Sequence, residues 1–309
     1  MKKSWPAFLA LVVMLGLCLA ASATFRNPAN LMNIARQVSY SGIIALGMTL
    51  VIAGGGIDLS SGSLVACSGI FSIEVMRRCT VLPAGAQLAV MLATALLCGI
   101  AGGAVNGALV NWGRIPPFIA TLGTLSIFRS LAVYQADAGL IMVDNAWLDR
   151  LCGGWTPVVV LLAVAGALAH LLRNTPLGWR ICAVGASERA AAYAAVSVRR
   201  VRFATYAIIG GLCGASAFLL AGRLSSISST GSGADYELDA IAAVIIGGTP
   251  MTGGRASVWG TLAGVLILGI IANVLDLWSI SANLQGMVKG LVIILAVLFQ
   301  FQKRRERVR

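Results

Sequence analysis

Charged residues are scarce in this chain of 309 residues, since Asp, Glu, Lys and Arg make up only 11% of it. Soluble domains carry about 25%. The apolar share of 58% is far too high for a disordered chain. A protein of this size with so few charges cannot cover its surface in water. The composition therefore excludes a soluble or disordered protein and indicates one that lies in a bilayer.

The residues that build common catalytic and metal sites are also missing. The chain has one histidine, His170, and no CxxC pair, so a zinc site lacks a ligand set. No Gly-Lys dipeptide occurs, which excludes a GxxxxGK[ST] phosphate loop. Asp235, Glu237 and Asp239 form an acidic group that is either a catalytic pair or the start of a helix, and we favour the helix start. We expect no catalytic residue, metal or cofactor.

Basic residues exceed acidic ones, at 23 Lys and Arg against 11 Asp and Glu. They form no basic face interleaved with aromatic residues, so nucleic acid is not the expected partner. They lie instead in short segments between apolar runs, which is typical of cytoplasmic loops. One such segment, near 173–202, holds Arg173, Arg180, Arg189, Arg199, Arg200 and Arg202.

Apolar runs of membrane length predict an all-α integral membrane protein with about ten transmembrane helices, some broken by glycine. They lie near 7–24, 39–54, 60–76, 86–106, 116–135, 157–172, 203–222, 238–248, 256–275 and 284–301. The loops between them are short, so residues 1–309 form a single polytopic domain. The basic residues concentrate in alternate loops and at both ends, including Lys2, Lys3, Arg307 and Arg309, which predicts that both termini are cytoplasmic.

The first apolar run allows two interpretations. It follows Lys2 and Lys3 and ends near Ala21-Ser22-Ala23, which also fits a cleavable signal peptide. We favour an uncleaved span, because the residues after Phe25 have no secreted-domain character. Glycines four residues apart within later runs, such as Gly99 and Gly103 or Gly210 and Gly214, predict close helix packing.

The segment Gly54–Ser63 is the most informative local feature. Its three consecutive glycines unwind a helix, which a membrane tolerates only beside protein or a watery cavity. Asp58 then lies near membrane depth, where a carboxylate is costly. It either caps the next helix or contacts a passing solute, to which Ser60 and Ser63 would offer hydroxyl groups.

Residues 51–65 are echoed by residues 244–258. Each segment has an apolar run, a glycine cluster, a polar turn and a second apolar run. The register needs a one-residue gap, so chance similarity is the alternative. Paired glycine-broken spans in the two halves of a chain indicate a solute path.

The basic segment near 173–202 has its own pattern. Gly185 offers a break, Ser187 an N-cap, and Glu188 begins a short alanine-rich helix that runs to about Ala195. A helix with such small side chains can dock into a groove on a partner protein. The alternative is an ordinary surface helix that touches lipid headgroups.

Several motifs in order give the chain a family resemblance. They are FRNPANLMNIARQ (25–37), GMTLVIAGGGIDLSSGS (47–63), NGALVNWGRIPPFIATLGT (106–124), NTPLGWRICAVGAS (174–187), YELDAIAAVIIGGTPMTGG (236–254) and VKG (288–290). The chain resembles the permease subunits of ribose/xylose-type carbohydrate ABC importers, which are related to branched-chain amino-acid permeases. It departs from the usual pattern at Ser61 (usually Val), Ser187 (usually Asn) and Ala195-Val196 (usually Gly-Ile).

The resemblance implies a multi-pass protein of the bacterial inner membrane that pairs with a second permease copy or a paralogue. A periplasmic sugar-binding protein would deliver the solute, and a cytoplasmic ATPase with tandem nucleotide-binding domains would use the ATP. The ATPase-coupling loop implied for this chain comprises Gly185, Ser187, Glu188, Ala191 and Ala192. The hypothetical solute path comprises Asp58, Ser60, Ser63, Asn106, Thr121 and Thr124.

Two other kinds of transporter remain as alternatives. A permease of the same superfamily could carry an amino acid or another small polar solute. An ion-coupled secondary transporter would need ionisable residues within the membrane as relays. Only Asp58, Arg129 and Lys289 qualify for that role.

Overall fold

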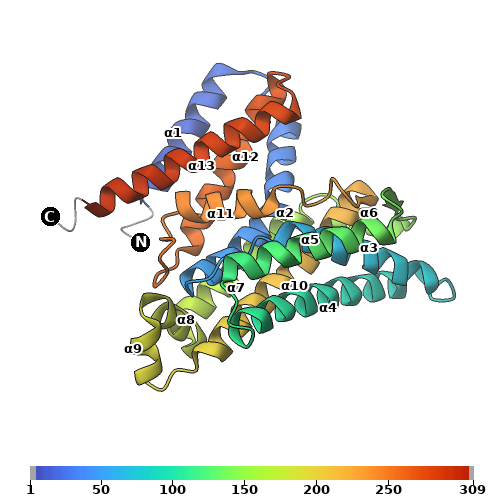
Figure 1. The fold of residues 1–309 in the computed structure, drawn as a ribbon. Helices are drawn as coiled ribbons and strands as arrows, with labels where there is room; N and C mark the ends of the chain where they lie inside the picture. The colour runs from blue at the N-terminus through green and yellow to red at the C-terminus, as the bar shows by residue number, and fades with distance from the viewer. Residues whose placement is uncertain (1–4, 306–309) are drawn as a thin grey trace.

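The structure, a computed structural model that describes residues 5–305, consists almost entirely of α-helices (Figure 1). In chain order the elements are α1 (Trp5–Ala21), α2 (Pro28–Ala53), α3 (Ser61–Arg78), α4 (Ala84–Asn111), α5 (Pro117–Gln135), β1 (Leu140–Met142), α6 (Ala146–Cys152), α7 (Thr156–Asn174), α8 (Pro176–Ala186), α9 (Glu188–Tyr193), α10 (Val198–Leu224), β2 (Ser226–Ser228), α11 (Tyr236–Ile246), α12 (Val258–Leu277) and α13 (Ala282–Arg305). Lys2, Lys3, Arg307 and Arg309, which entered the topology prediction, lie outside the described residues.

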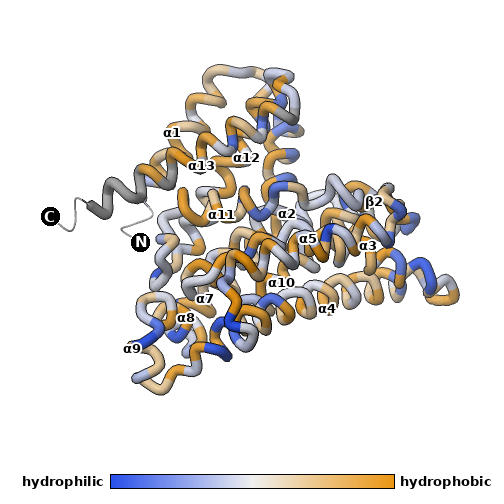
Figure 2. The backbone as a smooth tube through the Cα atoms, in the orientation of Figure 1, coloured by the Kyte–Doolittle hydropathy of each residue, from blue (hydrophilic) through white to orange (hydrophobic). Residues whose placement is uncertain are grey.

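A helix coincides with each of the ten predicted spans. Within the described residues, six helices are long and apolar enough to cross a membrane, namely α2, α4, α5, α7, α10 and α12. Apolar residues run along the helices, and hydrophilic ones gather toward their ends (Figure 2). α11 has 11 residues, whereas a full span takes about 20, so this helix makes up only part of its predicted span. The chain is an all-α membrane protein, and the total of ten spans stays a prediction.

The start of α2 differs from the sequence prediction, which placed it near residue 39. The helix begins at Pro28, and the side chain of Asn27 accepts the N–H of Ala29 at 2.9 Å. An N-cap and a proline at the first helical position set a helix start. The apolar run marks only the part of α2 that is suited to lipid, so it gave a start that was wrong by more than two turns.

Glycines let α4 and α10 approach closely. A Cβ atom on Gly103 would collide with the carbonyl of Tyr206, and one on Gly99 would collide with the carbonyl of Gly210. Gly214 lies equally close to the backbone of Ala95. The predicted role of these glycines in helix packing is therefore confirmed.

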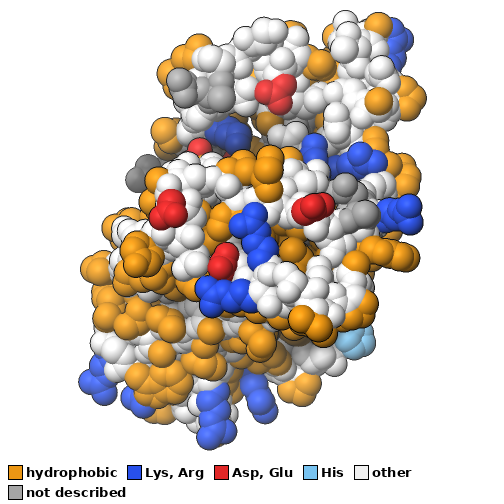
Figure 3. Space-filling model, turned by 90° about the vertical axis from the view of Figure 1, so that its right-hand side faces the viewer, with side chains coloured by type: hydrophobic (Ala, Val, Ile, Leu, Met, Phe, Trp, Pro, Cys, Tyr) orange, Lys and Arg blue, Asp and Glu red, His pale blue; other side chains and the backbone are white. Residues whose placement is uncertain are grey.

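The helices form two groups that share α2 and α11 (Figure 1). α1 and α13 pack on α12, whereas α3, α4, α5 and α10 pack around one another. α8 and α9 lie at one end of the molecule, on the left in Figure 1, and α6 lies at the opposite end. At that opposite end β1 and β2 pair antiparallel, with Leu140 opposite Ser228, and acidic and basic side chains gather there beside hydrophobic areas (Figure 3).

Candidate functional site

The polar residues predicted to line a solute path lie in one hydrogen-bonded network where α3, α4 and α5 meet. The Asn106 amide donates to Ser60 Oγ at 2.7 Å, and Thr124 Oγ1 donates to Asn106 Oδ1 at 2.6 Å. The Thr124 hydroxyl also donates to the Thr121 carbonyl at 3.2 Å. The Ser63 hydroxyl donates to the Ser60 carbonyl at 2.8 Å. The sequence therefore selected residues that the fold brings together, although the Thr121 hydroxyl donates to the Pro117 carbonyl at 2.8 Å and not to the network.

Burial shows what this network does within the chain. The six side chains, those of Asp58, Ser60, Ser63, Asn106, Thr121 and Thr124, are at most 2% exposed. Hydrogen bonds between buried side chains fix how the helices that carry them pack. The network thus joins three helices, and its contact with a solute stays a prediction.

Asp58 stabilises the turn that precedes α3. Its Oδ1 accepts both the N–H and the hydroxyl of Ser60, each at 2.8 Å. Ser60, not Asp58, is the N-cap residue of α3, so the capping interpretation holds for the turn but not for the first helical N–H groups. Asp58 Oδ2 and the neighbouring Ser61 Oγ are buried and have no hydrogen-bond partner among the described residues.

The two glycine-broken segments meet each other and the end of α8. The N–H of Gly254 donates to the carbonyl of Ala53 at 2.9 Å. A Cβ atom on Gly185 would collide with the same carbonyl and would lie 2.6 Å from the nitrogen of Gly254. Gly55 and Gly254 have φ angles of +79° and +81°, which favour glycine. We call this contact of residues 53–55, 253–254 and 185 the glycine junction.

The internal echo in the sequence corresponds to a shared local structure. α2 ends at Ala53 and α3 begins at Ser61, whereas α11 ends at Ile246 and α12 begins at Val258. Both segments are therefore a helix, a glycine turn and a second helix, as predicted. A hydrogen bond of 2.8 Å between the hydroxyls of Thr49 and Thr261 also links the two pairs.

The predicted coupling segment, residues 185–192, continues directly from the glycine junction. α8 ends at Ala186, and Ser187 Oγ accepts the N–H of Ala190 at 3.2 Å as the N-cap of α9. Glu188 Oε2 accepts a hydrogen bond from Arg202 Nη2 at 2.8 Å, which ties α9 to α10. Ala191 is buried, whereas Ala192 is exposed. The predicted cap and short helix are confirmed, whereas Gly185 lies within α8 and the break falls at Ser187.

The departure from the family pattern at Ala195 has a conformational cost. It has a φ of +58°, and the N–H of Val196 closes the turn after α9 on the Ala191 carbonyl at 3.0 Å. The left-handed conformation costs an L-residue about 1–2 kcal/mol, a cost that glycine avoids. The glycine that is usual at this position suits the turn, and the alanine of this chain adopts the same conformation at a cost.

The sequence places Arg129 and Lys289 within predicted spans but does not identify their partners. Arg129 Nη1 donates to the carbonyls of Ser229 and Ser232 at 2.8 and 3.0 Å, which holds the segment before α11. Lys289 in α13 forms an ion pair of 2.9 Å with Asp239. Asp239 lies in the first turn of α11, so the helix-start interpretation of the acidic group is confirmed. A charged side chain within an apolar helix requires a partner. Only the packed fold shows which group that partner is.

Two adjacent serines give a test of the network. We expect Ser60→Ala to lower the free energy of unfolding by about 1–3 kcal/mol, because it removes the buried hydroxyl that donates to Asp58 and accepts from Asn106. Ser61→Ala removes a hydroxyl that has no partner among the described residues, so we expect a change within about 0.5 kcal/mol. Thermal unfolding in detergent measures both. An equal loss in the two variants would contradict the network.

Comparison with known proteins places the chain in a family. The family model described as "Branched-chain amino acid transport system / permease component" matches residues 30–297. The ribose import permease protein RbsC of Bacillus subtilis is 37% identical over 98% of this chain and 94% of its own length. The protein of the same name from Escherichia coli K12 is 37% identical over 98% and 96%. The L-arabinose ABC transporter permease protein AraH of Azospirillum brasilense is 31% identical over 92% and 83%. This chain therefore belongs to the family of branched-chain amino acid transport system permease components.

Proposed function

We propose that this chain is the permease subunit of an ATP-binding-cassette importer for a monosaccharide of the ribose type. The observation that carries the proposal is the similarity to a ribose import permease over 98% of the chain. A galactose/methyl galactoside import permease of Haemophilus influenzae is also 31% identical over 94% of the chain. The similarity to permeases named for three sugars favours a sugar over an amino acid.

ATP hydrolysis takes place in a separate cytoplasmic ATPase in this proposal, because the chain has no phosphate loop. The glycine junction supplies a route from that ATPase to the transmembrane helices. A force on α9 reaches Gly185 through the short link at Ser187. Gly185 touches the backbone at Ala53, the last residue of α2, and at Gly254, which lies shortly before α12. The same displacement then acts on both glycine-broken segments, as alternating access requires.

Ten spans with both termini in the cytoplasm complete the proposal, with the protein in the bacterial inner membrane. The loops assigned to the inside contact one another, as at Gly185 and Gly254. The loops assigned to the outside also do so. Arg77 donates to the carbonyl of Met142 at 3.0 Å, and the Asn145 amide donates to the carbonyl of Ala84 at 3.2 Å. Two separate sets of loops support the alternation of spans.

The remaining partners follow from the importer class. A periplasmic sugar-binding protein delivers the solute at the outer end, and a second permease copy or a paralogue completes the pore. An ion-coupled transporter fits less well, because its candidate relays have structural partners. Lys289 pairs with Asp239, Arg129 binds backbone carbonyls, and Asp58 holds the turn at Ser60.

Reconstitution tests the proposed activity. The chain is combined in proteoliposomes with its ATPase and sugar-binding protein, and uptake of labelled ribose is measured. We expect the uptake to require ATP. Excess arabinose or galactose should compete with the labelled ribose, whereas leucine should not. ATP hydrolysis by the isolated chain, or uptake without the ATPase that a protonophore abolishes, would contradict the proposal.

The glycine junction yields a second test. Gly185→Ala places a methyl group against the Ala53 carbonyl, and such overpacking costs about 1–3 kcal/mol. We expect ATP-driven uptake to fall by about tenfold while the ATPase of the complex remains active. Gly166→Ala in α7 is the matched control, since a Cβ there has no heavy atom within 4 Å. Equal uptake by the two variants would exclude the junction from coupling.

The topology is tested by labelling intact cells. Arg189→Cys in α9 and Arg150→Cys in α6 are each treated with a membrane-impermeant maleimide, and labelling above that of the unchanged protein is measured. We expect labelling at position 150 only, because α6 lies at the outer end and α9 at the cytoplasmic end. External labelling at position 189 would overturn the proposed orientation.

A further inference from the structure

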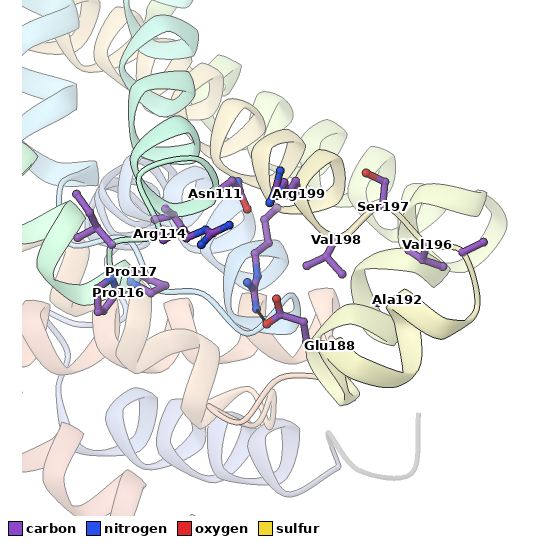
Figure 4. Close-up of a pocket in the computed structure, with 14 residues that line it drawn as sticks. Asn111, Arg114, Pro116, Pro117, Glu188, Ala192, Val196, Ser197, Val198 and Arg199 are labelled. Atoms are coloured by element: carbon purple, nitrogen blue, oxygen red, sulfur yellow. Dashed lines mark hydrogen bonds and ion pairs between the residues drawn. The ribbon is translucent and has the colours of Figure 1, made fainter.

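A cavity of about 760 Å³ lies between the α4–α5 connection and the turn that joins α9 to α10 (Figure 4). Arg114, Pro116 and Pro117 lie on one side of it, and Val196, Ser197 and Val198 lie on the other. Ligand sites in proteins span about 300–1,000 Å³. The cavity is therefore large enough to hold a small molecule or a lipid headgroup.

The charges that line this cavity are mostly positive. The lining of the cavity includes one acidic residue, Glu188, and three basic ones, Arg114, Arg199 and Arg202. Glu188 pairs with Arg202, whereas Arg114 and Arg199 form no ion pair within the described part of the chain. The guanidinium groups of Arg114 and Arg199 thus remain for a ligand that accepts hydrogen bonds and carries negative charge.

The backbone around the cavity favours the same kind of ligand. The first turn of α10 borders the cavity at Val198 and Arg199, and its N-cap Ser197 makes no side-chain capping bond. Free N–H groups at a helix start attract anions. Arg114 has a φ of +54°, a strained conformation for a non-glycine residue of the kind that occurs at ligand sites.

The surroundings indicate an anion with an apolar tail. Trp112, Phe118 and Ile119 flank the α4–α5 connection and are 58%, 54% and 59% exposed. Trp112 also packs edge-on against Phe203, with ring centroids 5.4 Å apart. Exposed aromatic residues at the end of apolar helices are typical of the membrane interface. A soluble anion would gain nothing from these neighbours, whereas a lipid would.

We propose that this cavity binds the phosphate headgroup of an anionic phospholipid from the cytoplasmic leaflet. The phosphate bridges Arg114 to Arg199 and Arg202, and the acyl chains lie along Phe118 and Ile119. Because Arg202 holds Glu188 at 2.8 Å, the bound lipid also fixes α9 relative to α4 and α5. An effect on transport rests on the proposed function of α9 in coupling, but binding of the lipid does not.

The test compares two double variants of the full chain with the same net charge. Arg114→Gln/Arg199→Gln removes the two unpaired guanidinium groups from the cavity. Arg173→Gln/Arg180→Gln removes two arginines on α7 and α8 that lie outside the lining of the cavity. Each protein is purified from nanodiscs of phosphatidylcholine with phosphatidylglycerol, and native mass spectrometry counts retained phosphatidylglycerol over a range of its content.

We expect the cavity variant to bind phosphatidylglycerol at least about tenfold more weakly than the unchanged protein, since charge-assisted hydrogen bonds are lost. The control variant should bind within about twofold of the unchanged protein. Equal weakening in both variants would overturn the proposal in favour of a diffuse attraction to basic residues.

Two further measurements separate the lipid from other occupants. Phosphatidylglycerol should raise the unfolding midpoint of the unchanged protein, and inorganic phosphate at millimolar concentration should not. A similar rise with inorganic phosphate would overturn the assignment to a lipid. A zero-length cross-link between an acidic residue of the ATPase and an amine in Arg199→Lys would show that a partner protein fills the cavity. Neither outcome depends on sugar uptake, so the proposed function is tested separately.

Discussion

The structure depends on how backbone groups are satisfied where the helices break. A buried peptide N–H or carbonyl without a partner costs about 1–3 kcal/mol. The two glycine turns of this chain meet that requirement partly through each other, because Gly254 donates to the carbonyl of Ala53. Neither turn can move far without breaking a hydrogen bond of the other. Two segments about 200 residues apart therefore behave as one element.

The short segment between α2 and α3 is held from several sides. Tyr206 of α10 donates its hydroxyl to the Ile57 carbonyl at 2.9 Å. Asn106 of α4 binds Ser60, and Gly185 of α8 abuts Ala53. Each anchor comes from a different helix, and of the two hydrogen bonds the one at Ser60 is buried and the one at Ile57 is partly buried. A change in the position of α4, α8 or α10 is thus transmitted to the start of α3.

The sequence predicted the local features well, and the tertiary contacts poorly. Apolar length located the helices, and a serine located the cap at Ser187, because these signals act within a few residues. The sequence selected Asn106 and Thr124 for the path but could not show that they bond to each other. The partners of Arg129 and Lys289, like the pairing of β1 with β2, depend on how distant helices dock. Strands of three residues carry too short a pattern to be recognised.

Small residues along the proposed coupling route have a mechanical consequence. A long side chain at a moving contact can change rotamer and absorb a displacement, whereas glycine and alanine have no such freedom. At the glycine junction, backbone touches backbone, so a shift of α8 must move residues 53 and 254 or separate from them. The same argument applies to α9, where Ala191 is buried and Glu188 is tied to Arg202. In the proposed mechanism, a force applied to α9 therefore passes through the glycine junction to the end of α2 and to the segment before α12.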